Sequence, residues 1–406
     1  MQGYIVIGAN FGDEGKGLVT DFLSTATARP IVVRFNGGAQ AGHTVVKQTG
    51  MDTFRHVFHH FGSGTLSGVS TFLSKYFITN PIAFNLEYET LSHTLAQFGR
   101  KADVTVDFKS PMTTPYDMII NEVIEEARGN KRHGSCGYGI GETVERTITD
   151  ERFVVRAEDM LHLRDLRDKL ITIRDEYVEY RLKDLSSKTG LALKVNLKYM
   201  TDTTIDFYID HCALMMSSVQ LNDIDYLKRY NTLIFEGAQG LLLDEFHKFF
   251  PHVTRSRTGI FNAVEIAKEL GLPEVDVFYV TRSYLTRHGA GPLPFEAPNK
   301  IYDKIEDTTN LPNKWQGDLR FAPLNVSLLK ESIKNDMATV NDIKVIPNLV
   351  ITCLDQLPHD TDVRYVQSGI VLENRVNAFI KTLKKIHPFS KVFGSYGPSR
   401  SDIVTL

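Results

Sequence analysis

Two acidic residues and a lysine stand among closely spaced glycines between Gly12 and Gly17. Glycines allow backbone N–H groups to approach an anion, and Lys16 supplies a point charge for phosphate oxygens. The segment is not a standard P-loop, because glycine follows the lysine where that motif has serine or threonine, its usual magnesium ligand. Asp13 is therefore a candidate metal ligand, or a general base, or both. The alternative interpretation is a structural glycine turn.

Two further glycine-rich turns carry polar residues that suit group transfer. His43 follows the glycines of segment 37–42, and its imidazole is a candidate general acid near neutral pH. Gln239, in segment 236–240, can hydrogen-bond a carbonyl or phosphoryl oxygen. Taken alone, each feature is more often structural than functional.

The three cysteines are too few and too scattered for a disulfide framework or a zinc site, which favours a reducing compartment. Cys136 lies in segment 134–141, which has four glycines in eight residues and favours a flexible loop or an anion-binding nest. We do not expect Cys136 to be a nucleophile, because inert cysteines are the common case.

Short apolar runs precede the glycine turns. Continuous apolar runs of strand length indicate strands buried on both faces, as in a parallel sheet, and ligands bind beyond the carboxyl ends of such strands. The sequence therefore predicts an α/β fold with a mainly parallel central sheet flanked by helices and P-loop-like glycine turns. The predicted strands are Tyr4–Gly8, Ile31–Phe35, Thr232–Phe235, Val277–Thr281, Leu349–Thr352 and Val392–Phe393.

Periodic and charged stretches predict the helices. These are Leu18–Thr25, Ala157–Leu185, Thr203–Tyr230, Asn262–Leu270 and Leu372–Ile386. No internal repeat or long linker separates them. We therefore expect a single domain over residues 1–406, with a mainly helical insertion around 90–230.

Composition excludes several classes of protein. The 406 residues have a formal net charge of −3, which lacks the basic excess of a bulk nucleic-acid binder. The N-terminus has no signal-peptide pattern, and no apolar run reaches 18 residues. The sequence thus predicts a cytoplasmic protein that binds neither nucleic acid nor membrane.

Four motifs, taken together and in this order, resemble the adenylosuccinate synthetases: GDEGKG from residue 12, GGxxAGHT from 37, EGAQGxLLD from 236 and TRxGAGPxP from 286. The resemblance extends over nearly the whole chain. It implies a carbon–nitrogen ligase that requires Mg²⁺. In this family a nucleoside triphosphate phosphorylates O6 of a purine monophosphate, and the amine of L-aspartate then displaces that phosphate at C6.

The resemblance also implies a role for each matching residue. Asp13 takes the N1 proton of the purine and coordinates Mg²⁺, and the carbonyl of Gly42 is a second metal ligand. His43 stabilises the transferring phosphoryl group and the O6 oxyanion, and Gln239 contacts O6. The residues implied in binding the triphosphate are Gly12, Glu14, Gly15, Lys16, Gly17, Thr44, Asp355 and Gly397.

Two more sets of residues follow from the same resemblance. Those implied in holding the purine nucleoside monophosphate are Gln40, Ser135, Cys136, Arg152, Thr254 and His288. Those implied in binding L-aspartate are Thr308, Thr309, Asn310 and Arg320. The family works as a homodimer that donates an arginine across the interface. Arg152 aligns best with that arginine, and Arg146 is the rival because of a small insertion near 146–152.

Two departures from the family pattern bear on the substrates. Most of the arginine cluster expected between Thr309 and Arg320 is missing, which suggests that a deoxyribose is tolerated. Cys353 stands where the family has a lysine that packs against the donor base, which favours ATP or dATP over GTP.

These departures resemble the phage-type 2-aminoadenylosuccinate synthetases, which use dGMP on the route to 2-aminoadenine DNA. We therefore expect dGMP as the substrate and 2-amino-2′-deoxyadenylosuccinate as the product, in the host cytoplasm if the chain is phage-encoded. One alternative is an adenylosuccinate synthetase that uses IMP and GTP in AMP synthesis, which retention of Asp13 fits equally well. The other is a non-catalytic nucleotide sensor.

Overall fold

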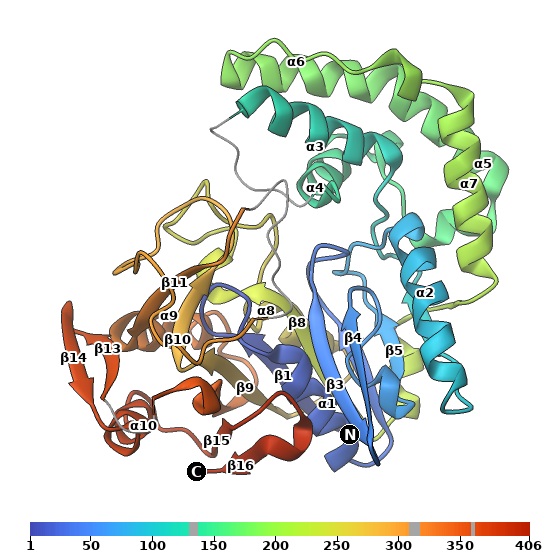
Figure 1. Ribbon diagram of the computed structural model, residues 1–406. Helices are drawn as coiled ribbons and strands as arrows, with labels where there is room; N and C mark the ends of the chain where they lie inside the picture. The colour runs from blue at the N-terminus through green and yellow to red at the C-terminus, as the bar shows by residue number, and fades with distance from the viewer. Residues whose placement is uncertain (130–136, 308–316, 359–361) are drawn as a thin grey trace.

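The structure is a computed structural model that describes residues 1–129, 137–307, 317–358 and 362–406. A sheet of ten strands lies at its centre, in the order β16-β15-β12-β9-β1-β8-β2-β5-β6-β7 (Figure 1). Neighbouring strands are parallel except for β15 and β16. The predicted α/β class with a mainly parallel sheet is confirmed. The strands are β1 (Gln2–Gly8), β2 (Pro30–Arg34), β5 (Ser70–Leu73), β6 (Val104–Asp107), β7 (Gln220–Asn222), β8 (Thr232–Gly240), β9 (Glu274–Arg282), β12 (Lys344–Thr352), β15 (Val392–Ser395) and β16 (Ile403–Thr405).

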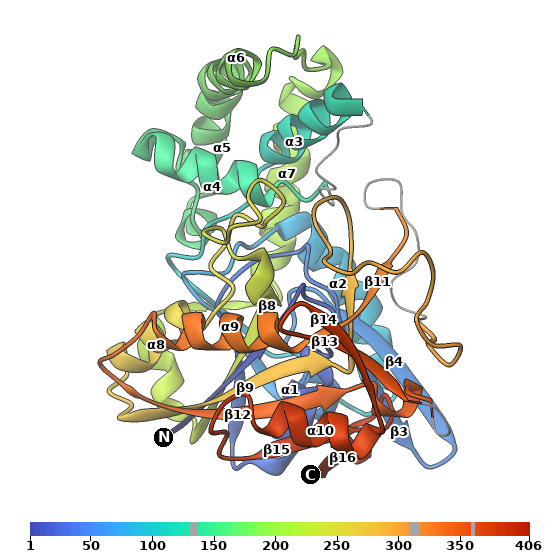
Figure 2. The same cartoon turned by 90° about the vertical axis from the view of Figure 1, so that its left-hand side faces the viewer.

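The central strands are largely apolar because both faces of the sheet are covered. In β1, Ile5 and Ile7 belong to the core that also contains residues of α8 (Phe261–Glu269) and α9 (Val326–Met337). Val6 points to the other face, where it packs with residues of α1 (Lys16–Ala26). Figure 2 shows α8 and α9 side by side along one face of the sheet.

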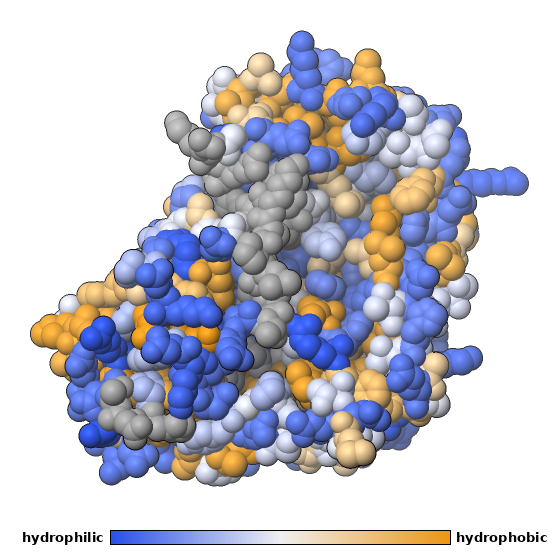
Figure 3. Space-filling model, viewed as in Figure 1, coloured by the Kyte–Doolittle hydropathy of each residue, from blue (hydrophilic) through white to orange (hydrophobic). Residues whose placement is uncertain are grey.

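A second group of helices stands over the sheet and forms its own apolar core (Figure 1). Apolar side chains also reach the surface of this group (Figure 3). The connection from β6 to β7 contains α3 (Pro115–Arg128), α4 (Ile140–Thr149), α5 (Leu163–Thr172), α6 (Val178–Thr189) and α7 (Asp202–Met216), and α2 (Pro81–Ala96) packs on α7. The single-domain organisation with an insertion around 90–230 stays a prediction.

Two smaller sheets complete the fold. Strands β3 (His43–Thr49) and β4 (Asp52–Phe58) form a hairpin, so His43 is the first residue of a strand. The other sheet has the order β10-β11-β13-β14, and its strands are β10 (Tyr284–Arg287), β11 (Arg320–Asn325), β13 (Val363–Gln367) and β14 (Ile370–Asn374). The last α-helix of the described chain, α10 (Val376–Lys384), packs on β13. His288 directly follows β10, so this sheet positions it.

Two predicted helices extended too far. The helix predicted over Thr203–Tyr230 ends at Met216, because Gln220–Asn222 instead pairs with β6 as the edge strand β7. The helix predicted over Leu372–Ile386 starts only at Val376, because Leu372 pairs with Tyr365 in the β13–β14 hairpin. In both places, pairing of the backbone in a sheet overrides the local helical pattern.

The helix predicted over Ala157–Leu185 is interrupted. It consists of a 3-10 turn at Ala157–Leu161, helix α5, a π-helical turn at Ile173–Tyr177, and helix α6. Across the described ranges, no helix combines the length and the apolar character that a bilayer crossing requires.

Candidate active site

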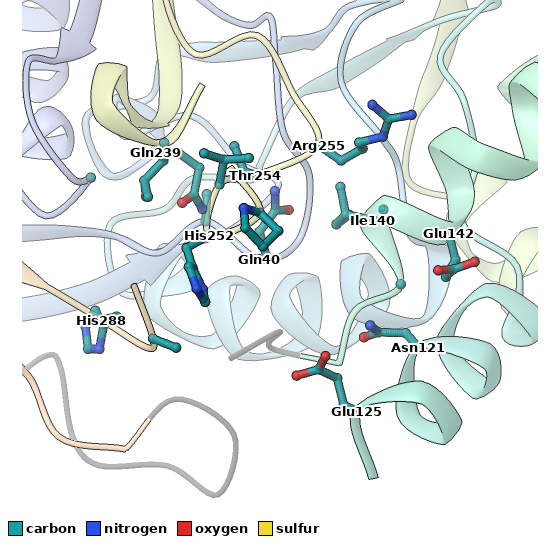
Figure 4. A pocket seen from close by; sticks show the side chains of 18 of the residues that line it. Gln40, Asn121, Glu125, Ile140, Glu142, Gln239, His252, Thr254, Arg255 and His288 are labelled. Atoms are coloured by element: carbon teal, nitrogen blue, oxygen red, sulfur yellow. The ribbon is translucent and has the colours of Figure 1, made fainter. Parts of the chain in front are cut away.

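A cleft of about 530 Å³ opens beyond the carboxyl ends of β1, β2 and β8, below the helical group. Figure 4 shows Gln40, Gln239, Thr254 and His288 on the side of the sheet, and side chains of α3 and α4 opposite them. This is the position expected for a ligand site in an open parallel sheet. The predicted site residues that line the cleft are Gly12, Asp13, Gln40, Gly42, His43, Gln239, Thr254 and His288.

The loop between β1 and α1 is held in shape by Glu14. Its buried carboxylate accepts the backbone N–H groups of Asn10 at 3.0 Å and Gly12 at 2.8 Å. The Lys16 ammonium lies 3.3 Å from the same carboxylate and donates to the carbonyl of Gly12. Gly12 and Gly15 have φ values of 118° and 93°, which disfavour any side chain. Glu14 thus shapes the loop, and Lys16 is the group of this loop that can turn a positive charge toward a phosphate.

His43 is oriented by a buried carboxylate. Its Nδ1 lies 2.7 Å from Oε1 of Glu236, which also accepts the backbone N–H of Ser63 at 3.0 Å through Oε2. Burial opposes the ionisation of Glu236, but His43 and Arg34 stabilise its negative charge and lower the pKa of Glu236 to about 2. Because Glu236 is ionised, Nδ1 of His43 carries the proton. Nε2 then remains as the ring atom that can act on a ligand.

Burial and the charge of Glu236 shift the pKa of His43 in opposite directions. Burial lowers the pKa of His43 to about 4, although the charge of Glu236 raises it. Within the described chain, the buried Nε2 has no hydrogen-bond partner. An incoming phosphoryl group would supply both a partner and the negative charge that stabilises an imidazolium.

Asp13 lines the same cleft and lies close to His288. Its Oδ2 is 3.4 Å from Nε2 of His288, and the two side chains are 24% and 18% exposed. The backbone carbonyl of Asp13 accepts a hydrogen bond from Arg282. The carboxylate is thus open to the cleft while its backbone is fixed.

Gln40 and Gln239 present amide groups to the same cleft (Figure 4). Both side-chain amide atoms of Gln40 are buried, and none of the described residues bonds to them. Buried amides are normally hydrogen-bonded, so a ligand in the cleft is their natural partner. Gln239 has a left-handed backbone with φ 65°, an uncommon conformation outside glycine that is often found at functional sites.

Two of the remaining predicted triphosphate residues, Asp355 and Gly397, lie at the same edge of the sheet. Asp355 belongs to a short turn directly after β12, and Gly397 follows β15, the neighbour of β12. Burial raises the pKa of Asp355. Thr44 is the second residue of β3 and pairs with Val57.

The two arginines considered for the dimer interface differ in their surroundings. Arg146 is fully buried and holds Asp117 through two hydrogen bonds of 2.9 Å, so it cannot reach another subunit without disrupting α3 and α4. Arg152 is 59% exposed and pairs with Asp150 and Glu176 at the surface. Of the two arginines, only Arg152 is exposed enough to reach the active site of a second subunit.

Arg320, predicted to bind aspartate, is engaged with its own chain. It donates to the carbonyls of Gly289 at 3.0 Å and Gly291 at 2.8 Å and pairs with Glu296. It therefore supports the turn that follows His288. Five predicted residues lie outside the described residues: Ser135, Cys136, Thr308, Thr309 and Asn310.

Sequence reasoning missed the residues that hold the site together. Glu236 orients His43, and Arg282 holds the backbone of Asp13. Their position at the carboxyl ends of predicted strands was the available signal. The cleft wall formed by α3, with Asn121 and Glu125, was also missed, because nothing in the local pattern relates that helix to the sheet.

The cleft can hold Mg²⁺ together with a ligand. Asp13 and the Gly42 carbonyl are hard oxygen donors at its wall. No group of three or more histidine, cysteine or acidic side chains in the described residues forms a metal cage. This donor set suits Mg²⁺, which commonly takes one or two protein oxygens and completes its shell with phosphate oxygens and water.

Comparison with known proteins gives one consistent family. The family model of adenylosuccinate synthetase matches residues 5–403. The enzyme of that name from Borrelia turicatae is 28% identical over 98% of this chain and 87% of its own, and that from Xylella fastidiosa M23 is 31% identical over 75% and 68%.

Two solved structures share the fold. A fully ligated adenylosuccinate synthetase from Plasmodium falciparum superposes with a TM-score of 0.74 at 19% identity, covering 99% of both chains. The succinoaminodeoxyadenylate synthetase of cyanophage S-2L, bound to dGMP and dATP, superposes with a TM-score of 0.63 at 15% identity, covering 100% of this chain and 95% of that one. The chain belongs to the adenylosuccinate synthetase family, and is thus a ligase that joins aspartate to a purine nucleotide.

Proposed function

We propose that the purine nucleotide is dGMP, that ATP or dATP is the phosphoryl donor, and that the product is 2-amino-2′-deoxyadenylosuccinate. The observation that carries the donor assignment is Cys353, which lies at the carboxyl end of β12 with a left-handed backbone of φ 60°. A cysteine cannot cover a purine ring as the long side chain of lysine does. The cyanophage protein with the same fold was solved with dGMP and with dATP as energy donor, which supports the same pair of substrates here.

The reaction would proceed in two steps. Asp13 takes the proton from N1 of the base, and O6 attacks the γ-phosphorus, so an O–P bond forms and the nucleoside diphosphate leaves. The amine of L-aspartate then attacks C6, the C6–O bond breaks, inorganic phosphate leaves and the amine loses a proton. Lys16 and the amides of its loop bind the donor phosphates, and Gln239 binds O6. Nε2 of His43 stabilises the negative charge that develops between the two nucleotides.

Mg²⁺, when bound, would neutralise charge on the donor phosphates. Asp13 and the Gly42 carbonyl are the residues that would hold it. Gln40 and Thr254 would grip the 5′-phosphate of the monophosphate, together with Arg152 of a second subunit. His288 would lie beside the base because of its distance of 3.4 Å from Asp13.

The second candidate is an adenylosuccinate synthetase that uses IMP and GTP. Two observations favour it: Asp13 is retained, and the Plasmodium enzyme superposes with the higher TM-score. The half-buried carboxylate of Asp355 can accept hydrogen bonds from a guanine as well as from other bases, so it does not separate the two candidates.

One assay separates the two candidates. The protein, Mg²⁺ and L-aspartate are combined with IMP, GMP or dGMP and with ATP, dATP or GTP, and products are identified by mass. We expect a succinyl adduct of dGMP with ATP or dATP. An adduct of IMP alone, formed only with GTP, would refute the proposal and support the second candidate. Absence of any adduct would favour a non-catalytic nucleotide sensor.

A further inference from the structure

Arg282 ends strand β9, and its guanidinium group lies between three segments of the site. Nε donates to the backbone carbonyl of Asp13. Nη2 donates to Oδ2 of Asp307 at 3.1 Å, and Nη1 donates to the hydroxyl of Tyr284 at 3.1 Å. All three nitrogens of one planar group are thus engaged in three different directions.

The environment keeps this buried group charged. The side chains of Arg282 and Asp307 are only 12% and 10% exposed. Burying a cation is costly unless a counter-ion and hydrogen-bond acceptors surround it. Asp307 is the counter-ion of Arg282, and the carbonyl of Asp13 and the hydroxyl of Tyr284 are the acceptors for its other nitrogens. Lysine could not replace it fully, because an ammonium group lacks the planar fork.

The contact with Asp13 fixes a loop that has no regular secondary structure. On one side Glu14 holds the amides of Asn10 and Gly12, and on the other Arg282 holds the carbonyl of Asp13. The direction of a side chain follows from the backbone that carries it. The carboxylate of Asp13 is therefore aimed by Arg282, and a displacement of about 1 Å at a reacting group can cost roughly 100-fold in rate.

The same guanidinium also contacts two other segments of the chain. Asp307 directly precedes Thr308, the first residue predicted to bind aspartate. Tyr284, after accepting from Arg282, donates to Oε1 of Gln356 at 2.6 Å. Gln356 follows Asp355, the residue predicted to contact the donor base. The side chain of Arg282 therefore connects the backbone of Asp13, the proposed general base, with two other segments, those of Asp307 and Gln356.

We infer that Arg282 is a positioning residue that aims Asp13 for the phosphoryl-transfer step and connects it to Asp307 and Gln356. The inference rests on the proposed function for the role of Asp13. It adds a residue that touches no substrate but sets the geometry of one that does.

The test compares Arg282→Met, Arg282→Lys, Asp307→Asn and the double variant Arg282→Met/Asp307→Asn. The matched control is Arg364→Lys, which alters an exposed arginine paired with Glu373 on the β13–β14 hairpin. We expect kcat to fall about 100-fold in Arg282→Met and about tenfold in Arg282→Lys, with the KM for the monophosphate changed less than about threefold. The control should keep wild-type kinetics.

Non-additivity is the sharper readout. If Asp307 acts through Arg282, the double variant loses no more kcat than Arg282→Met alone. Losses that multiply, or a kcat of Arg282→Met within about threefold of wild type, would overturn the inference. A variant with a lower unfolding temperature and unchanged kcat would do the same, because it would make Arg282 merely structural.

The outcome is independent of which monophosphate is used. Wild-type enzyme first identifies the substrate, and the variants are then measured with that nucleotide. A preference for IMP would refute the proposed dGMP substrate, yet leave the kcat ratios of the Arg282 variants as a valid test of positioning.

Discussion

The replacement Glu236→Gln tests whether the negative charge of Glu236 supports the action of His43 in phosphoryl transfer. Glu236 is fully buried, with Oε1 2.7 Å from Nδ1 of His43 and Oε2 4.0 Å from Arg34. Glutamine has nearly the same shape but no charge, and it offers one acceptor where the carboxylate has two. If its carbonyl faces His43, its NH₂ group faces Arg34 and the backbone N–H of Ser63, which are donors themselves.

The expected loss of kcat in Glu236→Gln follows from the loss of a charged hydrogen-bond acceptor. A hydrogen bond to an ionised group is worth about 1.5–3 kcal/mol, and each 1.4 kcal/mol is a factor of ten. Glu236 raises the pKa of His43, while burial holds it at about 4, so removing the carboxylate makes the imidazolium still harder to form. We therefore expect kcat to fall by roughly 10–150-fold while KM changes little.

The assay is the succinyl-adduct assay at saturating substrates, with unfolding temperature measured in parallel. Ser63→Ala is the matched control, because it removes a neutral hydroxyl that donates to Glu236 and leaves the charge in place. We expect it to lose less than about fivefold in kcat. Equal losses in both variants, or a loss confined to KM, would refute the argument that the charge of Glu236 acts through His43.

Three other perturbations have defined outcomes. Mixing Arg152→Leu with His43→Ala should restore up to about a quarter of wild-type activity through hybrid dimers, and no recovery would contradict a shared site. Cys353→Lys should raise the ratio of kcat/KM for GTP over ATP about tenfold, since a cation beside a purine ring contributes on the order of 1 kcal/mol or more, and an unchanged ratio would remove Cys353 as a determinant. Burial raises the pKa of Asp336 to about 7, although Ile260 and Tyr279 donate to it. The folded state then binds more protons than the unfolded state from about pH 4 to 7, so stability falls as pH rises through that window. Asp336→Asn should raise the unfolding temperature at pH 8 and not at pH 5, and equal shifts at both would contradict this.

The part of the site that could be predicted is the part that has a local pattern. Glycine turns after apolar runs predicted that segments 12–17, 37–44 and 236–240 meet at one edge of a parallel sheet, and residues from all three line the cleft. Strand polarity alone brings them together, because carboxyl ends of parallel strands share an edge.

The part that could not be predicted depends on contacts between distant segments. Arg282 and Asp13 are 269 residues apart, and Glu236 and His43 are 193 apart. Nothing local to either member of a pair indicates its partner. The same holds for Arg146: the family resemblance left it beside Arg152 as a candidate for the dimer interface, and only its buried ion pair with Asp117 separates the two. The helix predicted over Thr203–Tyr230 fails for a similar reason, since Gln220–Asn222 pairs with β6.

A common arrangement connects these pairs. Lys16 lies against Glu14, His43 against Glu236, and the backbone of Asp13 against Arg282. These three residues, all expected to act on a ligand, thus each have a charged companion with little exposure to solvent. A buried charge is stable only when paired, and a pair with fixed geometry loses little further freedom when a ligand arrives. The companions therefore serve stability and orientation at once. Replacing a companion should lower both the unfolding temperature and kcat, whereas replacing the acting residue should lower mainly kcat. Measuring the unfolding temperature and kcat on the same variants therefore separates the two roles at each pair.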